Sequence, residues 1–285
     1  MIRKAVITAA GRGTRFLPVT RAIPKEMIPL ISKPLIHYAV AEAVNAGISE
    51  IIFVTPPYRN VIKDYFDRNL ELERFLEDKG KTRLLGEMRA IPEMASFFYV
   101  RQAESRGLGH AVLTARELVG DEPFAVILPD DVIDARVPAL KQMLAVHQEH
   151  GTSVIAVENI EPRDSVKYGV IDPEMISLRT YRIKGLVEKP RPAEAPSSLG
   201  VVGRYILTPE IFVELEATPP GKINEIQLTD ALQRLLDHQA IYALEFEGTR
   251  YDTGTPLGML KANLALALKE PALSRELRAY LKTFI

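Results

Sequence analysis

The chain of 285 residues contains no cysteine, which excludes disulfide bonds, thiolate zinc sites and a cysteine nucleophile. It also lacks an excess of charge of either sign, because 36 Lys and Arg oppose 37 Asp and Glu and leave a net charge of −1. This balance argues against bulk electrostatic binding to nucleic acid or membranes, and we expect neither as a partner. A local cationic pocket is still allowed.

Long apolar segments are missing as well. No uninterrupted apolar run of about 18 residues occurs, and the first residues, MIRKAVITAAG, lack the long apolar stretch of a signal peptide. The 47% hydrophobic and 26% charged content is ordinary for a globular protein with a sizeable core. We therefore expect a cytoplasmic protein.

Buried strands alternate with helical apolar stripes along the first 160 residues. The expected strands are 4–10, 51–54, 97–100, 124–128 and 153–157, with helices at 34–46 and 140–150. Strand, loop, helix and strand in this order is the unit that builds parallel sheets. The pattern predicts an α/β fold with an open, mainly parallel sheet and helices on both faces.

The pattern changes after about residue 160. Short runs at 168–171, 183–187 and 201–207 predict a hairpin-rich insertion beside the main sheet, and helices are expected at 209–216, 226–238, 256–269 and 271–283, with a strand at 240–246. Residues 62–94 are charged with helical spacing and predict a solvated helical excursion, which could serve as a lid or an oligomer contact. No repeat or long linker divides the chain, so we expect a single domain over 1–285.

The segment AAGRGTR places two glycines directly after the first strand. Gly11 and Gly13 would let the backbone approach a phosphate without a Cβ in the way. The segment is not a dinucleotide fingerprint, because the third glycine is replaced by Phe16, and no Gly-Lys-Ser/Thr of a P-loop follows. Four cations follow the strand closely: Arg12, Arg15, Arg21 and Lys25. They could neutralise a triphosphate, or the segment could be a tight turn followed by a solvated basic stretch.

Prolines frame the lysine of IPKEMIPL. Pro24 fixes the backbone before Lys25, and Pro29 prevents a helix from forming across it. A lysine in a rigid extended loop near a glycine turn is suited to act as a positioned cation. A plain turn would have the same sequence features.

Carboxylates follow three apolar runs. In LPDD, Asp130 and Asp131 come where a buried strand leaves the sheet, the edge at which open α/β sheets place their ligands. Asp252 of YDTG ends another run, and together with Asp130 it could hold Mg²⁺ at a nucleotide's phosphates. In EKP, Glu188 could accept hydrogen bonds from sugar hydroxyl groups while Lys189 contacts a phosphate. Turn capping and a surface ion pair are the structural alternatives.

These segments together resemble a known family, the bacterial UTP–glucose-1-phosphate uridylyltransferases, also called UDP-glucose pyrophosphorylases. The resemblance rests on AGRGTRFLP, IPKEMIPL, KPLIHYAVAEA, RGLGHAV, LPDD, YGVI, VEKP, VVGRYIL, EIQLTDA and YDTG, in order from residue 4 to about residue 270. The glycine loop and its proline-lysine segment are shared by sugar-phosphate nucleotidyltransferases generally. PKEM, VVGRYIL and EIQLTDA look more specific to the uridylyltransferases.

The resemblance implies a fold, an assembly and a reaction. The fold would be a three-layer α/β/α domain with a mainly parallel, mixed sheet, the nucleotide-diphospho-sugar transferase (Rossmann-like) fold, assembled as a homotetramer or homodimer. A nucleotide-binding half would cover about 1–135, a sugar-phosphate half about 136–255, and C-terminal helices about 256–285. With Mg²⁺ as cofactor, UTP and glucose 1-phosphate would give UDP-glucose and pyrophosphate by in-line attack on the α-phosphorus.

The resemblance also implies roles for individual residues. Arg15 and Lys25 would be catalytic, and Asp130 and Asp252 would bind the metal. The nucleotide would contact Ala10, Gly11, Gly13, Thr14, Gln102 and Gly107. The sugar phosphate would contact Gly169, Glu188, Lys189 and Arg204.

Two departures from the family pattern leave alternatives open. Asp131 is an extra carboxylate beside Asp130, so the sequence does not decide which of them would meet a metal. Thr253 makes the last motif Asp-Thr-Gly, which is closer to glucose-1-phosphate thymidylyltransferases. A thymidylyltransferase is therefore one alternative, and a weakly active regulatory paralogue that binds nucleotide sugars is another.

Overall fold

The computed structural model describes residues 2–58, 60–221 and 224–284. Its strands are β1 Lys4–Thr8, β2 Pro29–Leu30, β3 Lys33–Pro34, β4 Glu50–Thr55, β5 Ser96–Arg101, β6 Phe124–Ile127, β7 Asp131–Asp134, β8 Val154–Asn159, β9 Gly169–Met175, β10 Thr180–Glu188, β11 Leu199–Leu207, β12 Tyr242–Glu245 and β13 Thr249–Asp252. Its helices are α1 Leu35–Asn45, α2 Val61–Phe66, α3 Leu70–Asp78, α4 Thr82–Ala90, α5 Leu108–Thr114, α6 Arg116–Val119, α7 Ala139–His150, α8 Ile211–Ala217, α9 Leu228–Leu235, α10 Pro256–Ala267 and α11 Pro271–Leu281. The expected helices and strands of the sequence are all present.

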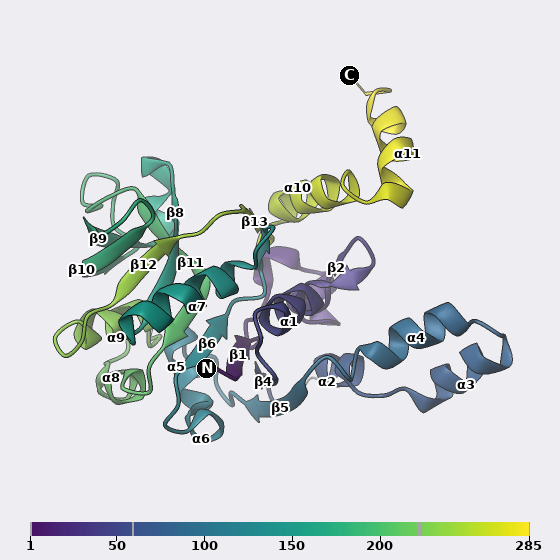
Figure 1. Ribbon diagram of the computed structural model, residues 1–285, viewed down its shortest axis with the longest axis horizontal. Coiled ribbons are helices and arrows are strands. Elements are labelled where there is room, and N and C mark those ends of the chain that lie inside the picture. The colour runs from purple at the N-terminus through teal and green to yellow at the C-terminus, as the bar shows by residue number, and fades with distance from the viewer. Residues whose placement is uncertain (1, 59, 222–223, 285) are drawn as a thin grey trace.

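Among the described residues, nine strands form one sheet in the order β5-β4-β1-β6-β11-β8-β12-β10-β9 (Figure 1). β5, β4, β1 and β6 run parallel, so their carboxyl ends meet at one edge. β11 runs antiparallel between β6 and β8. The sheet is therefore mixed and continuous across both expected halves of the chain.

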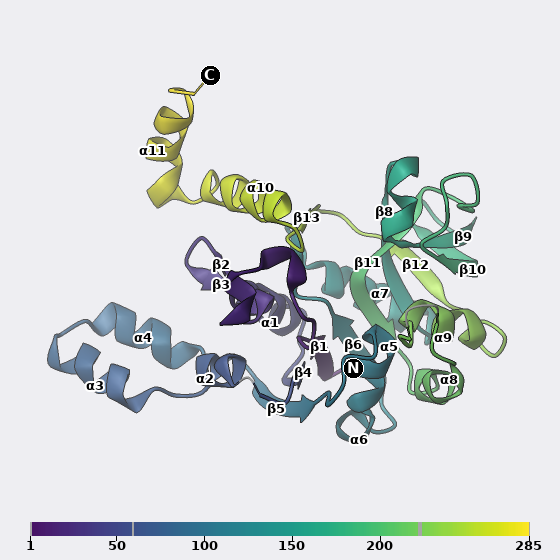
Figure 2. The ribbon, with the colours of Figure 1, turned by 180° about the vertical axis from the view of Figure 1, so that it is seen from behind.

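Side chains of the central strands alternate between two cores, because successive residues of a strand point to opposite faces. Val6 of β1 packs into one cluster with α5, α8 and α9, and Ile7 packs into the other cluster with α1, α2 and α7. The two views show these helix sets on opposite sides of the sheet (Figures 1 and 2). The predicted three-layer α/β/α fold is confirmed.

The expectation of a hairpin-rich insertion beside the sheet is wrong for β11. All nine of its residues are buried, and an antiparallel strand covered on both faces belongs in the middle of a sheet rather than in a separate hairpin. β9 and β10 do form an antiparallel pair at the sheet's far end. An additional pairing of Gly200 with Val170 joins β11 to β9, so the strands of the second half curl back on themselves.

Two segments project from the sheet. The arm formed by α3 and α4 is the expected helical excursion and lies at the lower right of Figure 1. α10 and α11 follow β13 and lie above the arm in that view. None of the helices within the described ranges combines the length and apolar character that crossing a membrane requires.

Candidate active site

A cavity of about 690 Å³ opens beside the carboxyl ends of the parallel strands. Seven residues singled out in the sequence line it: Arg15, Asp130, Asp131, Asp252, Gly169, Glu188 and Lys189. Its size is within the usual range for a small-molecule site. Charged groups of both signs therefore meet at the edge of the sheet where the sequence places them.

The glycine loop lies against the stem of Lys25. Gly13 has φ +63°, and the hydroxyl of Thr20 donates a hydrogen bond to its carbonyl oxygen over 2.8 Å. A Cβ at Gly13 would come within 3.0 Å of Thr20, and one at Gly11 would lie 3.7 Å from Cε of Lys25. Ala10 precedes this loop and Thr14 begins the 3₁₀ turn that follows it. The loop thus brings bare backbone next to a cation.

Lys25 itself lies in a 3₁₀ turn, Lys25–Met27, and not in the extended loop that its flanking prolines predicted. Pro24 is extended, with φ −62°, and enters this turn as its N-cap. Proline favours such an entry because its fixed φ suits the first residues of a helix. The lysine is held rigidly, but by a turn instead of an extended segment.

Lys25 pairs with Asp130 across 2.5 Å. Burial alone would lower the pKa of Lys25, but the negative charge of Asp130, with those of Glu26 and Asp131, outweighs burial and raises it. Burial alone would raise the pKa of Asp130, but the charge and hydrogen bond of Lys25 outweigh burial and lower it. Both groups are therefore charged at neutral pH.

Arg15, Asp130 and Asp252 converge on Gly254. A Cβ at Gly254 would lie 3.0 Å from Oδ1 of Asp252, 3.1 Å from Oδ2 of Asp130 and 3.3 Å from Nη1 of Arg15. Arg15 Nη1 also donates to the Gly254 carbonyl over 3.3 Å. Thr253 supports the group, because its backbone N–H and hydroxyl both donate to the carbonyl of Asp130, over 2.8 and 2.7 Å. Glycine leaves room where these charged groups meet.

Asp131, the extra carboxylate, has both oxygens engaged. Oδ1 accepts from Arg250 over 2.8 Å, and Oδ2 accepts from the backbone N–H of Gly203 over 2.8 Å. Arg250 is held in turn by Glu158 at 2.6 Å and by the hydroxyl of Tyr168 at 3.0 Å. Asp131 is thus part of a structural network, which makes Asp130 the better candidate for a cation ligand.

Carboxylates are the candidate metal ligands at this position. Among the described residues no group of three or more His, Cys, Asp or Glu side chains could hold a metal. Asp130 and Asp252 still fit Mg²⁺, which commonly takes one or two carboxylates and completes its shell with substrate phosphates and water.

Three of the sugar-phosphate candidates, Gly169, Glu188 and Lys189, line the same cavity. Gly169 at the start of β9 pairs with Glu188 at the end of β10, and a Cβ at Gly169 would come within 3.2 Å of the Thr229 hydroxyl oxygen. Lys189 contacts Glu188 across 3.0 Å and has φ +47°. A left-handed conformation is costly for lysine and is commonest at functional sites.

Gln102 and Gly107 lie together next to this cavity. Gln102 Nε2 donates to the Gly107 carbonyl over 3.3 Å and lies 2.8 Å from Nδ1 of His110. Gly107 has φ +97°, and a Cβ there would come within 2.7 Å of the carbonyl oxygen of Ile226. The following residue, Leu108, lines the cavity.

Arg204 points away from the cavity. Its neighbours Gly203 and Tyr205 line it, so Arg204 faces the other side of β11 by strand alternation. Its side chain is 1% exposed and pairs with Glu42 of α1. The prediction that Arg204 lies with the sugar phosphate fails because alternation directs its side chain into the core.

Sequence reasoning assigned no role to several lining residues, namely Tyr168, Gln227, Thr229 and Arg250. Glu225 also lines the cavity, and Gln227 is the N-cap of α9. The period of two along β13 could have found Arg250, because it shares a strand face with Asp252.

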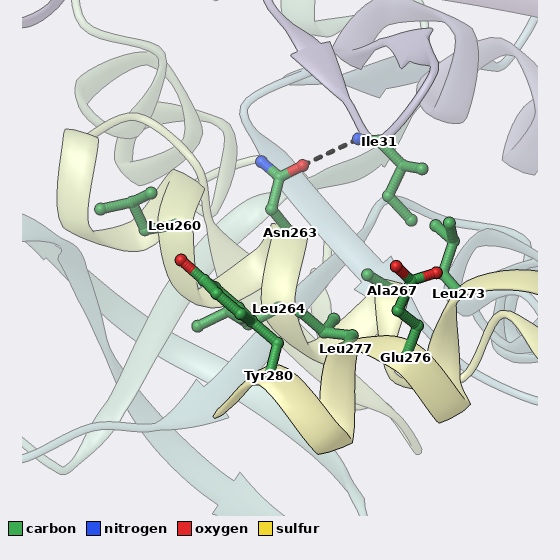
Figure 3. Close-up of a pocket in the computed structure, with 9 residues that line it drawn as sticks. All are labelled: Ile31, Leu260, Asn263, Leu264, Ala267, Leu273, Glu276, Leu277 and Tyr280. Atoms are coloured by element: carbon green, nitrogen blue, oxygen red, sulfur yellow. Dashed lines mark hydrogen bonds between the residues drawn. The ribbon is translucent and has the colours of Figure 1, made fainter. Parts of the chain in front are cut away.

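A second hollow has none of these charged residues in its lining. It measures about 550 Å³ and is a largely apolar groove between α10 and α11, lined by Leu260, Leu264, Leu273, Leu277 and Tyr280 among others (Figure 3). Asn263, at its rim, accepts a hydrogen bond from the Ile31 backbone N–H over 2.8 Å. This largely apolar lining suits contact with another protein surface and not phosphate binding.

Comparison with known proteins identifies the family of this chain. Residues 4–269 match the protein family described as Nucleotidyl transferase. The chain belongs to the nucleotidyl transferase family. A UTP–glucose-1-phosphate uridylyltransferase of Staphylococcus epidermidis is 50% identical to this nucleotidyl transferase over 99% of the chain and 98% of the relative.

Solved structures with the same fold include ligand complexes. A UDP-glucose pyrophosphorylase complexed with UDP-glucose is 46% identical, with a TM-score of 0.88 over 95% of this nucleotidyl transferase and 100% of that chain. The UTP-bound UGPase from Acinetobacter baumannii is 42% identical, with a TM-score of 0.92 over 99% of both chains. The family and fold implied by the sequence motifs are confirmed.

Proposed function

We propose that this chain is a UTP–glucose-1-phosphate uridylyltransferase, which makes UDP-glucose and pyrophosphate from UTP and glucose 1-phosphate. The observation that carries the proposal is that one cavity is lined both by Arg15, Asp130 and Asp252 and by Glu188 and Lys189. Lys25 joins the first group through its pair with Asp130. Two sets of charged residues from different elements suit two anionic substrates. Full-length relatives named for this activity support the same choice.

In the proposed reaction, a phosphate oxygen of glucose 1-phosphate forms a bond to the α-phosphorus of UTP. The bond from that phosphorus to the bridging oxygen breaks, and pyrophosphate leaves with the electron pair. The nucleophile is already an anion, so no general base is required. The protein has to bring two polyanions together and stabilise the charge that grows on the leaving group.

The two cations beside the glycine loop are suited to this task. Lys25 and Arg15 would bind the triphosphate, and their fixed charges would stabilise the transition state without reorganising. The backbone of Ala10, Gly11, Gly13 and Thr14 would accompany the nucleotide. Gln102 and Gly107 would meet the uracil edge, within the half of the domain that covers about 1–135.

The sugar phosphate would bind to the half that covers about 136–255. Glu188 can accept hydrogen bonds from hydroxyl groups of the sugar, Lys189 can contact its phosphate, and Gly169 leaves room for the ring. The chemistry that Mg²⁺ supplies when bound is neutralisation of phosphate charge, and Asp130 and Asp252 are the residues that would hold it.

Asp130→Asn tests the metal role. Loss of one ligand charge should raise the Mg²⁺ concentration for half-maximal activity by about tenfold or more. An unchanged Mg²⁺ titration would remove Asp130 from the ligand set.

Pyrophosphate release tests the overall proposal. UTP, dTTP, ATP, CTP and GTP are each paired with glucose 1-phosphate, and we expect the highest kcat/KM with UTP. Uracil and thymine share the same hydrogen-bonding edge, so a pocket that excludes one methyl group discriminates by about 10–200-fold. Preference for dTTP would instead identify a thymidylyltransferase, and no release with any nucleotide would favour a regulatory binder.

We also propose a cytoplasmic homo-oligomer, dimer or tetramer, that buries the groove between α10 and α11. α10 carries apolar residues around its whole circumference, yet only Met259 and Ala262 are buried, and helices of this kind are normally covered. Leu260 is 61% exposed and Tyr280 60%. A second copy would offer the same face in a two-fold contact, which light scattering would detect as a dimer or tetramer.

A further inference from the structure

The guanidinium of Arg204 has its full set of hydrogen bonds within the protein. Nε contacts both carboxylate oxygens of Glu42, at 3.2 and 3.1 Å, and Nη2 contacts Oε2 at 2.8 Å. Nη1 donates to the carbonyls of Leu128 and Gly203 over 3.0 and 2.9 Å, and Nη2 donates to the carbonyl of Asp131 over 2.7 Å. Arginine has five N–H donors, so these contacts leave none for a substrate.

Two of these acceptors enclose the cation candidate. The carbonyls of Leu128 and Asp131 lie on either side of Pro129 and Asp130 in the chain. Arg204 therefore fixes both ends of the short turn that carries the Asp130 carboxylate toward Lys25 and the cavity.

Gly203, the residue before Arg204, also binds the turn 128–131. The Gly203 carbonyl accepts from the Leu128 backbone N–H over 2.9 Å, and the Gly203 N–H donates to Asp131 Oδ2 over 2.8 Å. A Cβ at Gly203 would lie 2.5 Å from both Asp131 Oδ2 and Leu128 Cβ. β11 and the turn 128–131 are thus in direct contact, and only glycine allows it.

Glu42 orients the guanidinium from the opposite side. It lies on α1, its side chain is 9% exposed, and it also accepts from the Leu140 backbone N–H over 3.1 Å. A buried pair is not by itself evidence for stability, because desolvation offsets much of the attraction. The Glu42–Arg204 pair lies behind the turn that carries Asp130, and this position suggests that the pair serves to hold that turn.

We propose that Arg204, oriented by Glu42, is a positioning residue that holds the turn 128–131 and thereby places the Asp130 carboxylate for the cation and the triphosphate. This inference rests on the proposed function. It replaces the sugar-phosphate role that the sequence suggested for Arg204, and the two roles predict different measurements.

Arg204→Met removes the hydrogen bonds that hold the turn 128–131 but leaves the buried Glu42 carboxylate without its partner. The double variant Glu42→Gln with Arg204→Met removes both charges, and the introduced amide keeps an acceptor for the Leu140 N–H. We expect the double variant to recover thermal stability relative to the single variant. Its kcat should stay about tenfold or more below the wild type, because the two turn carbonyls have lost their donor.

Mn²⁺ binding, followed as loss of the free-ion signal in electron paramagnetic resonance, gives a readout that does not need turnover. We expect the Mn²⁺ dissociation constant of the double variant to rise about tenfold. The KM for glucose 1-phosphate should stay within about twofold of the wild-type value, since no donor of Arg204 faces the cavity.

The matched control is Glu73→Gln in the α3–α4 arm, which breaks another buried carboxylate's pairs, with Arg68 and Arg89. It should leave kcat and Mn²⁺ affinity unchanged. Recovery of wild-type kcat and Mn²⁺ affinity in the double variant would overturn the proposal. A large rise in the KM for glucose 1-phosphate with unchanged Mn²⁺ affinity would overturn it in favour of a substrate contact. If the wild type itself releases no pyrophosphate, the proposed function fails, and the Mn²⁺ titration still decides the role of Arg204.

Discussion

Replacing Lys25 with methionine tests the catalytic centre most sharply, because the side chain stays nearly as long and loses its charge. In the wild type, Nζ lies 2.5 Å from Asp130 and the stem lies beneath Gly11. Removal of one preorganised donor from a site of this kind lowers kcat by about 10²–10³-fold, or about 3–4 kcal/mol of transition-state stabilisation. We expect a loss of this size for Lys25→Met, with a much smaller change in the KM for glucose 1-phosphate.

Stability gives an independent check on the same variant. The lowered pKa of Asp130 means that its carboxylate contributes stability above the ordinary aspartate pKa. That contribution is lost as the pH falls through the lowered value. Without Lys25 the carboxylate has lost its partner, so the variant should be less stable at pH 7 by about 1–3 kcal/mol. The difference from the wild type should narrow at low pH.

Steady-state kinetics and urea denaturation at pH 7 and pH 3 provide both measurements. Lys33→Met is the matched control, since Lys33 is an exposed lysine of the neighbouring β2–β3 hairpin. A variant at position 25 with near-normal kcat and normal stability would refute the role given to Lys25.

Three further predictions concern other parts of the molecule. Gly107→Ala should raise the KM for UTP by about tenfold or more, because the new Cβ would meet the carbonyl oxygen of Ile226 at 2.7 Å. Gly120→Ala is the control, since Gly120 has φ +70° and no atom lies within 4 Å of its Cβ position; equal effects of the two variants on this KM would show that backbone strain alone is responsible. Burial lowers the pKa of His37 to about 4, so the free energy of unfolding should fall by up to about 3 kcal/mol between pH 6.5 and pH 4, as the unfolded chain takes up the proton. The free energy of unfolding of His37→Gln should depend less on pH over this range, and a pH dependence identical to that of the wild type would contradict the assignment. Leu260→Glu should reduce the size of the oligomer in light scattering, while Leu178→Glu, at a leucine that is 86% exposed, should leave it unchanged. An oligomer of unaltered size in Leu260→Glu would exclude the groove between α10 and α11 as the contact.

Local patterns were enough to predict most of the fold. The helix of α1 and its end near Gly47 follow from apolar spacing, and the three-layer arrangement follows from the alternation of strands and helices. The place of β11 could not be predicted in this way. A strand's neighbours in a sheet depend on long-range pairing, and Gly200–Val170 and Tyr205–Ile155 are contacts between segments far apart in sequence.

Residue types at strand ends predicted much of the candidate site. Asp130 and Asp252 each follow an apolar run, and the structure brings both to Gly254. Arg204 shows the limit of such reasoning, because a motif identifies a residue but not the face of the strand from which it projects. The choice between Asp130 and Asp131 also needed the structure, since it depends on the distant partner Arg250.

The path of a labelled phosphate oxygen tests the central claim most directly. Glucose 1-phosphate carrying ¹⁸O in its non-bridging phosphate oxygens is incubated with UTP, Mg²⁺ and the enzyme, and the products are analysed by ³¹P nuclear magnetic resonance. Attack on the α-phosphorus predicts UDP-glucose with ¹⁸O in the bridge between its two phosphorus atoms, and unlabelled pyrophosphate. Label in pyrophosphate, or no UDP-glucose at all, would contradict the account.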